Sequence, residues 1–170
     1  MTSKNKYIQS LKVQNKLSPE EIITLVDEAE DLLSKCINPI TTNSNRTTGI
    51  AIGKIQSGKT SSMEMLSHIA KDNGFKIIVV LSGTNEVLTK QTQSRFYESI
   101  KGFGWHRIYI PGNSKNMNIN TEITKAVRSL ETWDKSDYDA NEKRTVFIIT
   151  MKHHGRIRRM TDFLERVMKE

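Results

Sequence analysis

The residues with the clearest chemistry form a glycine-rich segment at positions 53–60, which reads Gly-Lys-Ile-Gln-Ser-Gly-Lys-Thr. This G-x-x-x-x-G-K-T spacing is that of a phosphate-binding P-loop (Walker A), whose glycines let backbone N–H groups surround phosphate oxygens. Lys59 can reach the β- and γ-phosphates, and the Thr60 hydroxyl can ligate Mg²⁺. The pattern predicts binding of ATP with Mg²⁺, with Lys59 and Thr60 in the catalytic roles. The residues expected at this site are Gly53, Gln56, Ser57, Gly58, Lys59, Thr60 and Ser61.

The segments on either side of this loop fit the same interpretation. Residues 48–52 form a short apolar run that suits a buried strand, and apolar residues then recur at helical spacing through residues 63–70. The loop would therefore join a strand to the N-terminus of a helix, where the helix dipole favours phosphate. The alternative is a glycine-rich strand-to-helix turn with an incidental lysine.

Composition limits the class of protein. The chain has 170 residues, 36% of them hydrophobic and 26% charged, which is enough for one domain with a core. No apolar run approaches the ~20 residues of a membrane helix, and no signal peptide is visible at the N-terminus. The single cysteine, Cys36, excludes an internal disulfide and is expected to be a small packing residue. We therefore expect a cytoplasmic protein without a membrane partner. The net charge of +7 suits a polyanionic partner such as nucleic acid, although a nucleotide site already requires positive charge.

Two regions follow from the order of the predicted elements. Residues 1–17 show no clear period, whereas Ser-Pro-Glu-Glu at 18–21 is a capping box that predicts a helix over residues 19–36. We expect residues 1–47 to form a helical arm and linker, and residues 48–170 to form a partial P-loop NTPase (RecA-like) domain.

Strands and helices alternate in the second region, which predicts an α/β fold with a mostly parallel sheet flanked by helices. Three further strands are predicted after the strand at 48–52, the first of them from a continuous apolar, β-branched run typical of a buried parallel strand. These strands cover residues 76–81, 105–110 and 145–150. Helical patterns follow at residues 85–100, around residues 123–130, and from about 157 to 169, and residues 131–144 are expected to form a loop.

Three segments taken together resemble the first ATPase lobe of superfamily-two helicases. They are the loop at 53–60, Ile-Ile-Val-Val-Leu-Ser-Gly-Thr at 77–84 and Leu-Thr-Lys-Gln-Thr-Gln-Ser-Arg at 88–95. More narrowly, they resemble an endonuclease family that carries a Z-one domain. The resemblance implies a nucleic-acid-dependent ATPase, a helicase-like or restriction-type hydrolase, with DNA favoured over RNA as its partner. It also places Ser82, Gly83 and Thr84 against the nucleic-acid backbone.

Four further residues are candidates for phosphate contact. Gln91 and Arg95 lie four residues apart and share a face of the predicted helix, although a solvated helix face is an equal alternative. Lys152 and Arg156 belong to a basic stretch after the last predicted strand, where helicase lobes often carry a Thr and a Gly-Arg pair. The alternative for this stretch is a charged helix start.

Two other patterns are set aside. Val-Asp-Glu-Ala-Glu at 26–30 resembles a D-E-A-x box, but it precedes the P-loop and falls inside a capped amphipathic helix. The pair His153 and His154 lacks the converging ligands that zinc requires, since adjacent side chains are expected to point apart.

Hydrolysis of ATP needs a carboxylate at a strand end, and no predicted strand after the loop is followed by Asp or Glu. We therefore expect the chain to be the N-terminal part of a larger ATPase, truncated before its acidic motif, with the remaining lobe or a nuclease domain as partner. Alone it would hydrolyse ATP poorly. The alternatives are a non-catalytic nucleotide- or nucleic-acid-binding module and a small nucleotide kinase.

Overall fold

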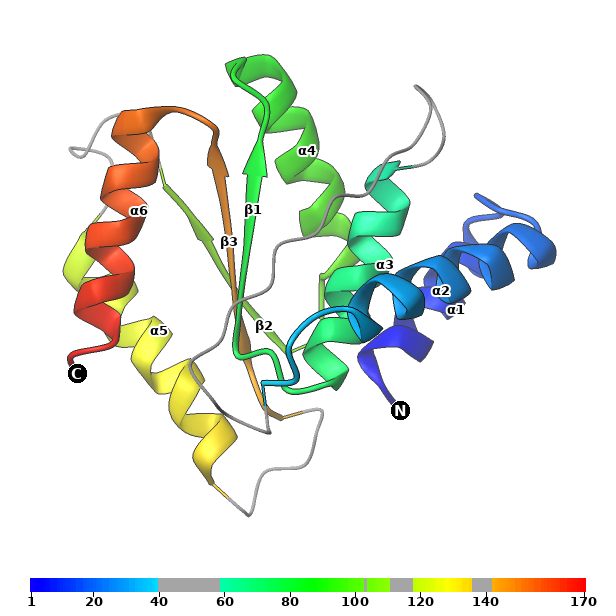
Figure 1. Cartoon of the computed structure of the whole chain (residues 1–170), viewed down its shortest axis with the longest axis horizontal. Helices are drawn as coiled ribbons and strands as arrows, with labels where there is room; N and C mark the ends of the chain where they lie inside the picture. Colours follow the sequence, from blue (N-terminus) through cyan, green and yellow to red (C-terminus); the bar gives the residue numbers. More distant parts are fainter. Residues whose placement is uncertain (40–58, 103, 111–117, 136–141) are drawn as a thin grey trace. The chain divides into compact units, whose positions relative to one another are not determined.

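The computed structural model describes residues 1–39, 59–102, 104–110, 118–135 and 142–170 (Figure 1). These residues form two compact units, residues 1–75 and 76–170. The predicted strand at 48–52 and the boundary between residues 47 and 48 lie outside the described residues, so both stay predictions.

The first unit consists of three helices, α1 (Ser3–Val13), α2 (Pro19–Ser34) and α3 (Lys59–Asp72). Helix α1 lies within residues 1–17, where the sequence shows no clear period: Thr2 caps it, and two residues one turn apart, Tyr7 and Leu11, are buried on it. The apolar pattern that marks α1 in the sequence is short, and polar residues surround it.

Helix α2 confirms the predicted capping box. The Ser18 hydroxyl accepts from the Glu21 backbone N–H at 3.2 Å, and the Glu21 carboxylate accepts from the Ser18 N–H at 2.7 Å. The acidic segment at 26–30 is helical, as expected for a charged helix face. Cys36 is exposed, so its expected packing role was wrong.

The three helices of the first unit share one apolar core. Its buried members come from all three, and they are Tyr7, Leu11, Ile22, Leu25, Ala29, Met65 and Ile69. Burial of these side chains stabilises helices that would be marginal in isolation.

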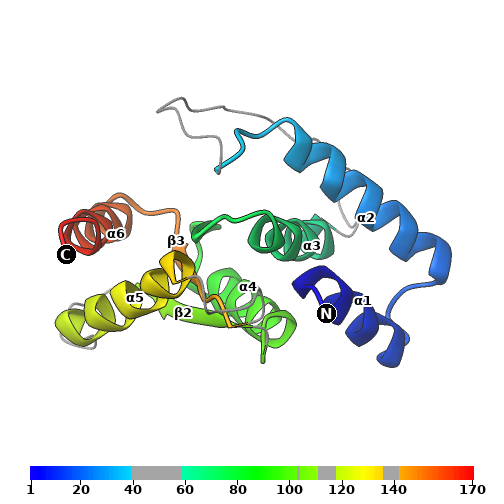
Figure 2. The same ribbon diagram turned by 90° about the horizontal axis from the view of Figure 1, so that it is seen from below.

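The second unit is built on a parallel sheet of three strands, β1 (Ile77–Ser82), β2 (Trp105–Tyr109) and β3 (Thr145–Met151), in the order β1-β3-β2. Three helices flank it: α4 (Glu86–Ser99), α5 (Ile119–Asp134) and α6 (His154–Val167). Figure 2 shows α5 and α6 on one side of the strands and α4 on the other. The α/β class and the parallel sheet flanked by helices are therefore confirmed.

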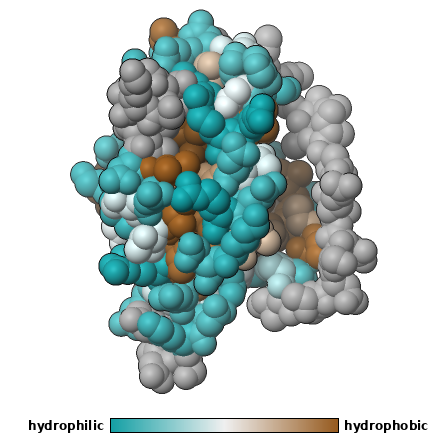
Figure 3. Space-filling model, turned by 90° about the vertical axis from the view of Figure 1, so that its left-hand side faces the viewer, coloured by the Kyte–Doolittle hydropathy of each residue, from teal (hydrophilic) through white to brown (hydrophobic). Residues whose placement is uncertain are grey.

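The central strand β3 separates two apolar clusters because its side chains alternate between the faces of the sheet. Val146 and Ile148 pack with residues of α5 and α6, whereas Phe147 and Ile149 pack with residues of α4. All four are fully buried, as expected for the middle strand of a parallel sheet. The outer surface on the side of α5 and α6 is largely hydrophilic, with hydrophobic patches between its polar side chains (Figure 3).

Helix α5 is longer than the sequence suggests. Residues 131–134 were expected to belong to a loop, but they form the last turn of α5. Two contacts explain this end: the Trp133 indole donates to the Arg144 carbonyl at 2.8 Å, and the Arg144 N–H donates to the Thr132 hydroxyl at 2.8 Å. No helix in the described part of the chain is long and apolar enough to cross a membrane.

Candidate functional site

The predicted phosphate-binding residues reach the described structure only at their C-terminal end. Lys59 and Thr60 form the first turn of α3, which confirms the helix expected after the loop. Thr60 and Ser61 are half-buried. The side chain of Lys59 lies outside the described structure, as do the other predicted loop residues Gly53, Gln56, Ser57 and Gly58. Helix α3, which is 14 residues long, thus begins at the two residues predicted to bind phosphate and Mg²⁺. Its N-terminus is the positive end of the helix dipole.

Polar contacts from α1 hold helix α3. The Tyr7 hydroxyl donates to the Glu64 carboxylate at 2.6 Å, and the Ser3 hydroxyl lies 2.7 Å from His68 Nδ1. The rings of Tyr7 and His68 stack with centroids 4.6 Å apart. All four side chains are buried, so α1 fixes the helix that opens at Lys59 by directional contacts as well as by apolar packing.

The end of α3 provides a second connection to α1. The Asp72 carboxylate accepts from the backbone N–H groups of Ser3 and Lys4, each at 2.8 Å, and so satisfies two N–H groups at the start of α1. Burial, followed by the charge and the hydrogen bond of Glu64, raises the pKa of Tyr7 well above its usual range. Burial likewise lowers the pKa of Lys71, against the opposing effect of Asp72.

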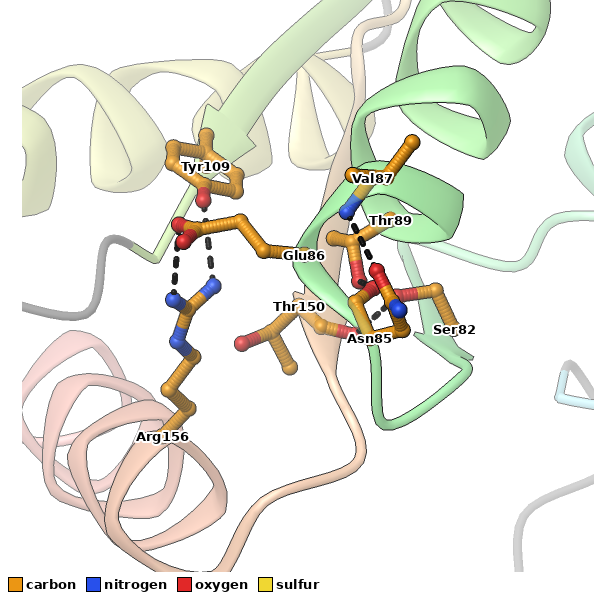
Figure 4. A network of polar contacts seen from close by, with 8 residues as sticks. All are labelled: Ser82, Asn85, Glu86, Val87, Thr89, Tyr109, Thr150 and Arg156. Carbon is orange, nitrogen blue, oxygen red and sulfur yellow. Dashed lines mark hydrogen bonds and ion pairs between the residues drawn. The ribbon is translucent and has the colours of Figure 1, made fainter.

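A second polar cluster lies at the carboxyl edge of the sheet, where β1 and β3 end side by side (Figure 4). Ser82 Oγ lies 2.9 Å from Thr89 Oγ1 and 3.1 Å from the Thr150 carbonyl oxygen. The Thr89 hydroxyl donates to the Asn85 carbonyl at 2.9 Å, and Asn85 Oδ1 caps α4 by accepting from the Val87 N–H. The predicted contact residue Ser82 is therefore buried and bonded, whereas Gly83 and Thr84 beside it are exposed.

Arg156 joins the ends of three elements. Its guanidinium on α6 donates to the Tyr109 hydroxyl at 3.1 Å and to the Glu86 carboxylate at 3.2 Å. Arg156 is buried, so contact with a nucleic-acid backbone would require this pairing to open. Lys152 is exposed, and its backbone N–H donates to the Ser82 carbonyl at 3.0 Å.

Thr150 is the buried polar group of this edge that lacks a partner. Its Oγ1 atom has no hydrogen bond to any described residue, although the side chain is fully buried. Figure 4 shows this hydroxyl pointing to the side of the cluster where Arg156 lies. An unpaired buried hydroxyl costs free energy.

Helix α4 brings the two remaining candidates together. Gln91 and Arg95 are exposed and line one shallow depression on α4 with Val87, Lys90 and Ser94, which confirms the shared face predicted from their spacing. Whether this face contacts nucleic acid stays a prediction.

Sequence reasoning missed Glu86 and Tyr109, which pair with Arg156. Their placement depends on the strand order β1-β3-β2, and no local sequence pattern predicts that order. It was also wrong about the histidine pair, because the rings of His153 and His154 lie with centroids 4.5 Å apart rather than pointing apart. His153 Nδ1 accepts from the Gly155 N–H at 3.3 Å as the cap of α6. The described residues contain no group of three or more His, Cys, Asp or Glu side chains that could hold a metal ion.

Comparisons of the chain with protein-family models, with curated proteins and with solved structures found no match.

Proposed function

We propose that this protein binds ATP with Mg²⁺ through residues 53–61, as the ATP-binding part of a nucleic-acid-dependent, helicase-like ATPase. The observation that carries the proposal is the position of Lys59 and Thr60, which open helix α3 directly after the glycine-rich segment. A helix N-terminus supplies unpaired N–H groups and a positive dipole end to phosphate oxygens. The buried contacts between α1 and α3 would keep this terminus in place when the charged ligand binds.

The carboxyl edge of the sheet supports the nucleic-acid part of the proposal. Gly83 and Thr84 expose backbone and hydroxyl groups there, and Gln91 and Arg95 are exposed on α4. Ligands of open parallel sheets bind beyond the carboxyl ends of the strands, where helix N-termini converge. Contacts of this type hold phosphates without reading sequence.

One observation favours a second function, a binding module without hydrolysis. The residues that directly follow β1, β2 and β3 are Gly83, Ile110 and Lys152, none of which is acidic. Glu86, the carboxylate within the cluster at this edge, is paired with Arg156. A carboxylate that holds Mg²⁺ at a strand end is therefore not among the described residues, and the chain would bind the nucleotide without efficient turnover.

Equilibrium titration with labelled ATP and with single-stranded DNA, combined with a turnover assay, separates these functions. Turnover that rises with DNA and is lost in Lys59→Ala supports the ATPase. Binding of both ligands without turnover supports the binding module. Absence of ATP binding by the wild-type chain contradicts both, and phosphoryl transfer to a nucleoside monophosphate would indicate a nucleotide kinase.

A further inference from the structure

A second basic site lies at the opposite edge of the sheet, where β2 and β3 begin. A cavity of about 690 Å³ opens there beside the C-terminal half of α5. Four of its lining residues lie on one face of α5, at spacings of three and four: Lys125, Arg128, Ser129 and Thr132. The others precede or begin the strands: Gly104, His106, Glu142 and Arg144.

Two arginines line this cavity, Arg128 and Arg144. Neither Arg128 nor Arg144 makes a side-chain hydrogen bond or ion pair with any described residue, although the backbone of Arg144 is anchored to Thr132 and Trp133. The Lys125 ammonium adds a third positive charge, and its Nζ atom also pairs with Glu122 Oε1 at 2.9 Å. The one carboxylate among the lining residues belongs to Glu142, so the described lining residues carry a net positive charge.

The hydroxyl groups of the wall are already used as donors. Ser129 donates to the Lys125 carbonyl at 2.9 Å, and Thr132 donates to the Ser129 carbonyl at 2.6 Å. The attraction for a ligand therefore comes from the cations rather than from the hydroxyls.

His106 adds an imidazole to the same wall. Its Nε2 atom is buried without a hydrogen bond and lies 3.6 Å from Glu122 Oε2, which is longer than a hydrogen bond. Burial lowers the pKa of His106, an effect that Glu122 opposes and that Lys125 and Arg144 strengthen. The imidazole is therefore mainly neutral at neutral pH.

We propose that this cavity binds a small molecule carrying a phosphate group, held between the guanidinium groups of Arg128 and Arg144. Guanidinium forks match tetrahedral oxyanions through paired hydrogen bonds, and two unpaired forks with a neighbouring ammonium suit a dianion better than a single carboxylate. All its lining residues belong to the second unit and lie at the amino edge of the sheet. It does not depend on the proposed ATP site.

The test measures binding of inorganic phosphate and of ribose 5-phosphate to the full chain carrying Lys59→Ala, so that the predicted P-loop does not contribute. Both ligands are titrated by calorimetry and by the NMR signals of the His106 ring. We expect Arg128→Ala/Arg144→Ala to weaken binding at least ~10-fold and to abolish the His106 response. Arg158→Ala/Lys169→Ala removes the same charge at exposed positions outside the cavity and should leave binding unchanged.

The two ligands identify the source of the phosphate. Tighter binding of ribose 5-phosphate supports a phosphorylated metabolite, and equal binding supports free phosphate. Equal weakening of ligand binding in the two double variants would show non-specific attraction and overturn the proposal. An NMR signal of His106 that shifts with neither ligand would also overturn it. Arg128 and Arg144 are exposed, so these variants are expected to fold, which circular dichroism can verify.

Discussion

The guanidinium of Arg156 and the carboxylate of Glu86 lie 3.2 Å apart, although 70 positions separate them in the chain. The Arg156 side chain is 7% exposed and the Glu86 side chain 59% exposed. The pair connects the first turns of α6 and α4, and the hydroxyl of Tyr109 extends the connection to the end of β2. It thereby fixes the carboxyl edge at which nucleic acid is proposed to bind.

Removing the acidic partner should destabilise the protein. Glu86→Ala leaves the buried guanidinium of Arg156 with the Tyr109 hydroxyl as its side-chain partner among the described residues, so we expect the free energy of unfolding to fall by about 1–2 kcal/mol. Denaturant unfolding followed by circular dichroism measures this loss. Glu98→Ala, at an exposed position on the same helix, is the matched control and should change stability by less than ~0.5 kcal/mol. Equal effects of both substitutions would show that the ion pair contributes nothing.

Thr150 should tolerate loss of its hydroxyl. Because Oγ1 is buried without a hydrogen bond, Thr150→Val should raise the free energy of unfolding by up to about 1 kcal/mol. The same denaturation experiment measures the gain. A loss greater than ~1 kcal/mol would show that the hydroxyl has a stabilising partner in solution.

The contact between α1 and α3 can be tested at Tyr7. Tyr7→Phe removes the hydrogen bond to the buried Glu64 carboxylate and should cost about 1–3 kcal/mol at neutral pH. Because the pKa of Tyr7 is raised, its contribution is fully present below the usual tyrosine pKa of about 10 and is lost as the pH rises above it. Val13→Ala, at an exposed site on α1, serves as the control. A loss below ~0.5 kcal/mol for Tyr7→Phe would contradict the role of this contact.

Stability should depend on pH through His106. Its folded pKa is lowered, so the unfolded chain binds the proton more readily, and the free energy of unfolding falls as the pH drops from about 6.5 through the folded pKa. His106→Asn should reduce this slope, which unfolding curves between about pH 4 and 8 would measure. His154→Asn, at an exposed position, is the control and should keep the wild-type slope. An unchanged slope in His106→Asn would be evidence against burial of the imidazole in solution.

The parts of this fold that follow from local pattern were predictable. Strands β1 and β3 are largely apolar runs, and α2 carries a complete capping box, so each could be placed within one or two residues. Helix α1 was missed because only Tyr7 and Leu11 mark its buried side, and the end of α5 was missed because contacts with Arg144 extend it.

The candidate sites differ in the same way, since some follow from a local sequence pattern and others depend on the fold. A motif whose chemistry is contiguous, such as the segment ending in Lys59 and Thr60, is visible in the sequence. The pairing of Arg156 with Glu86 and Tyr109, and the placement of Arg128 and Arg144 around one cavity, depend on which elements are neighbours in the fold. Such sites become visible only when the fold brings distant segments together.

The dissociation constant of Mg²⁺-ATP, measured for wild type and for Lys59→Ala, tests the central proposal most directly. Lys90→Ala, at an exposed position on α4, controls for lost charge, and Arg128→Ala/Arg144→Ala controls for binding at the second basic cavity. If residues 53–61 bind ATP, Lys59→Ala should weaken binding by at least ~10-fold while both controls stay within about threefold of wild type. Equal affinity in wild type and Lys59→Ala would contradict the proposed function.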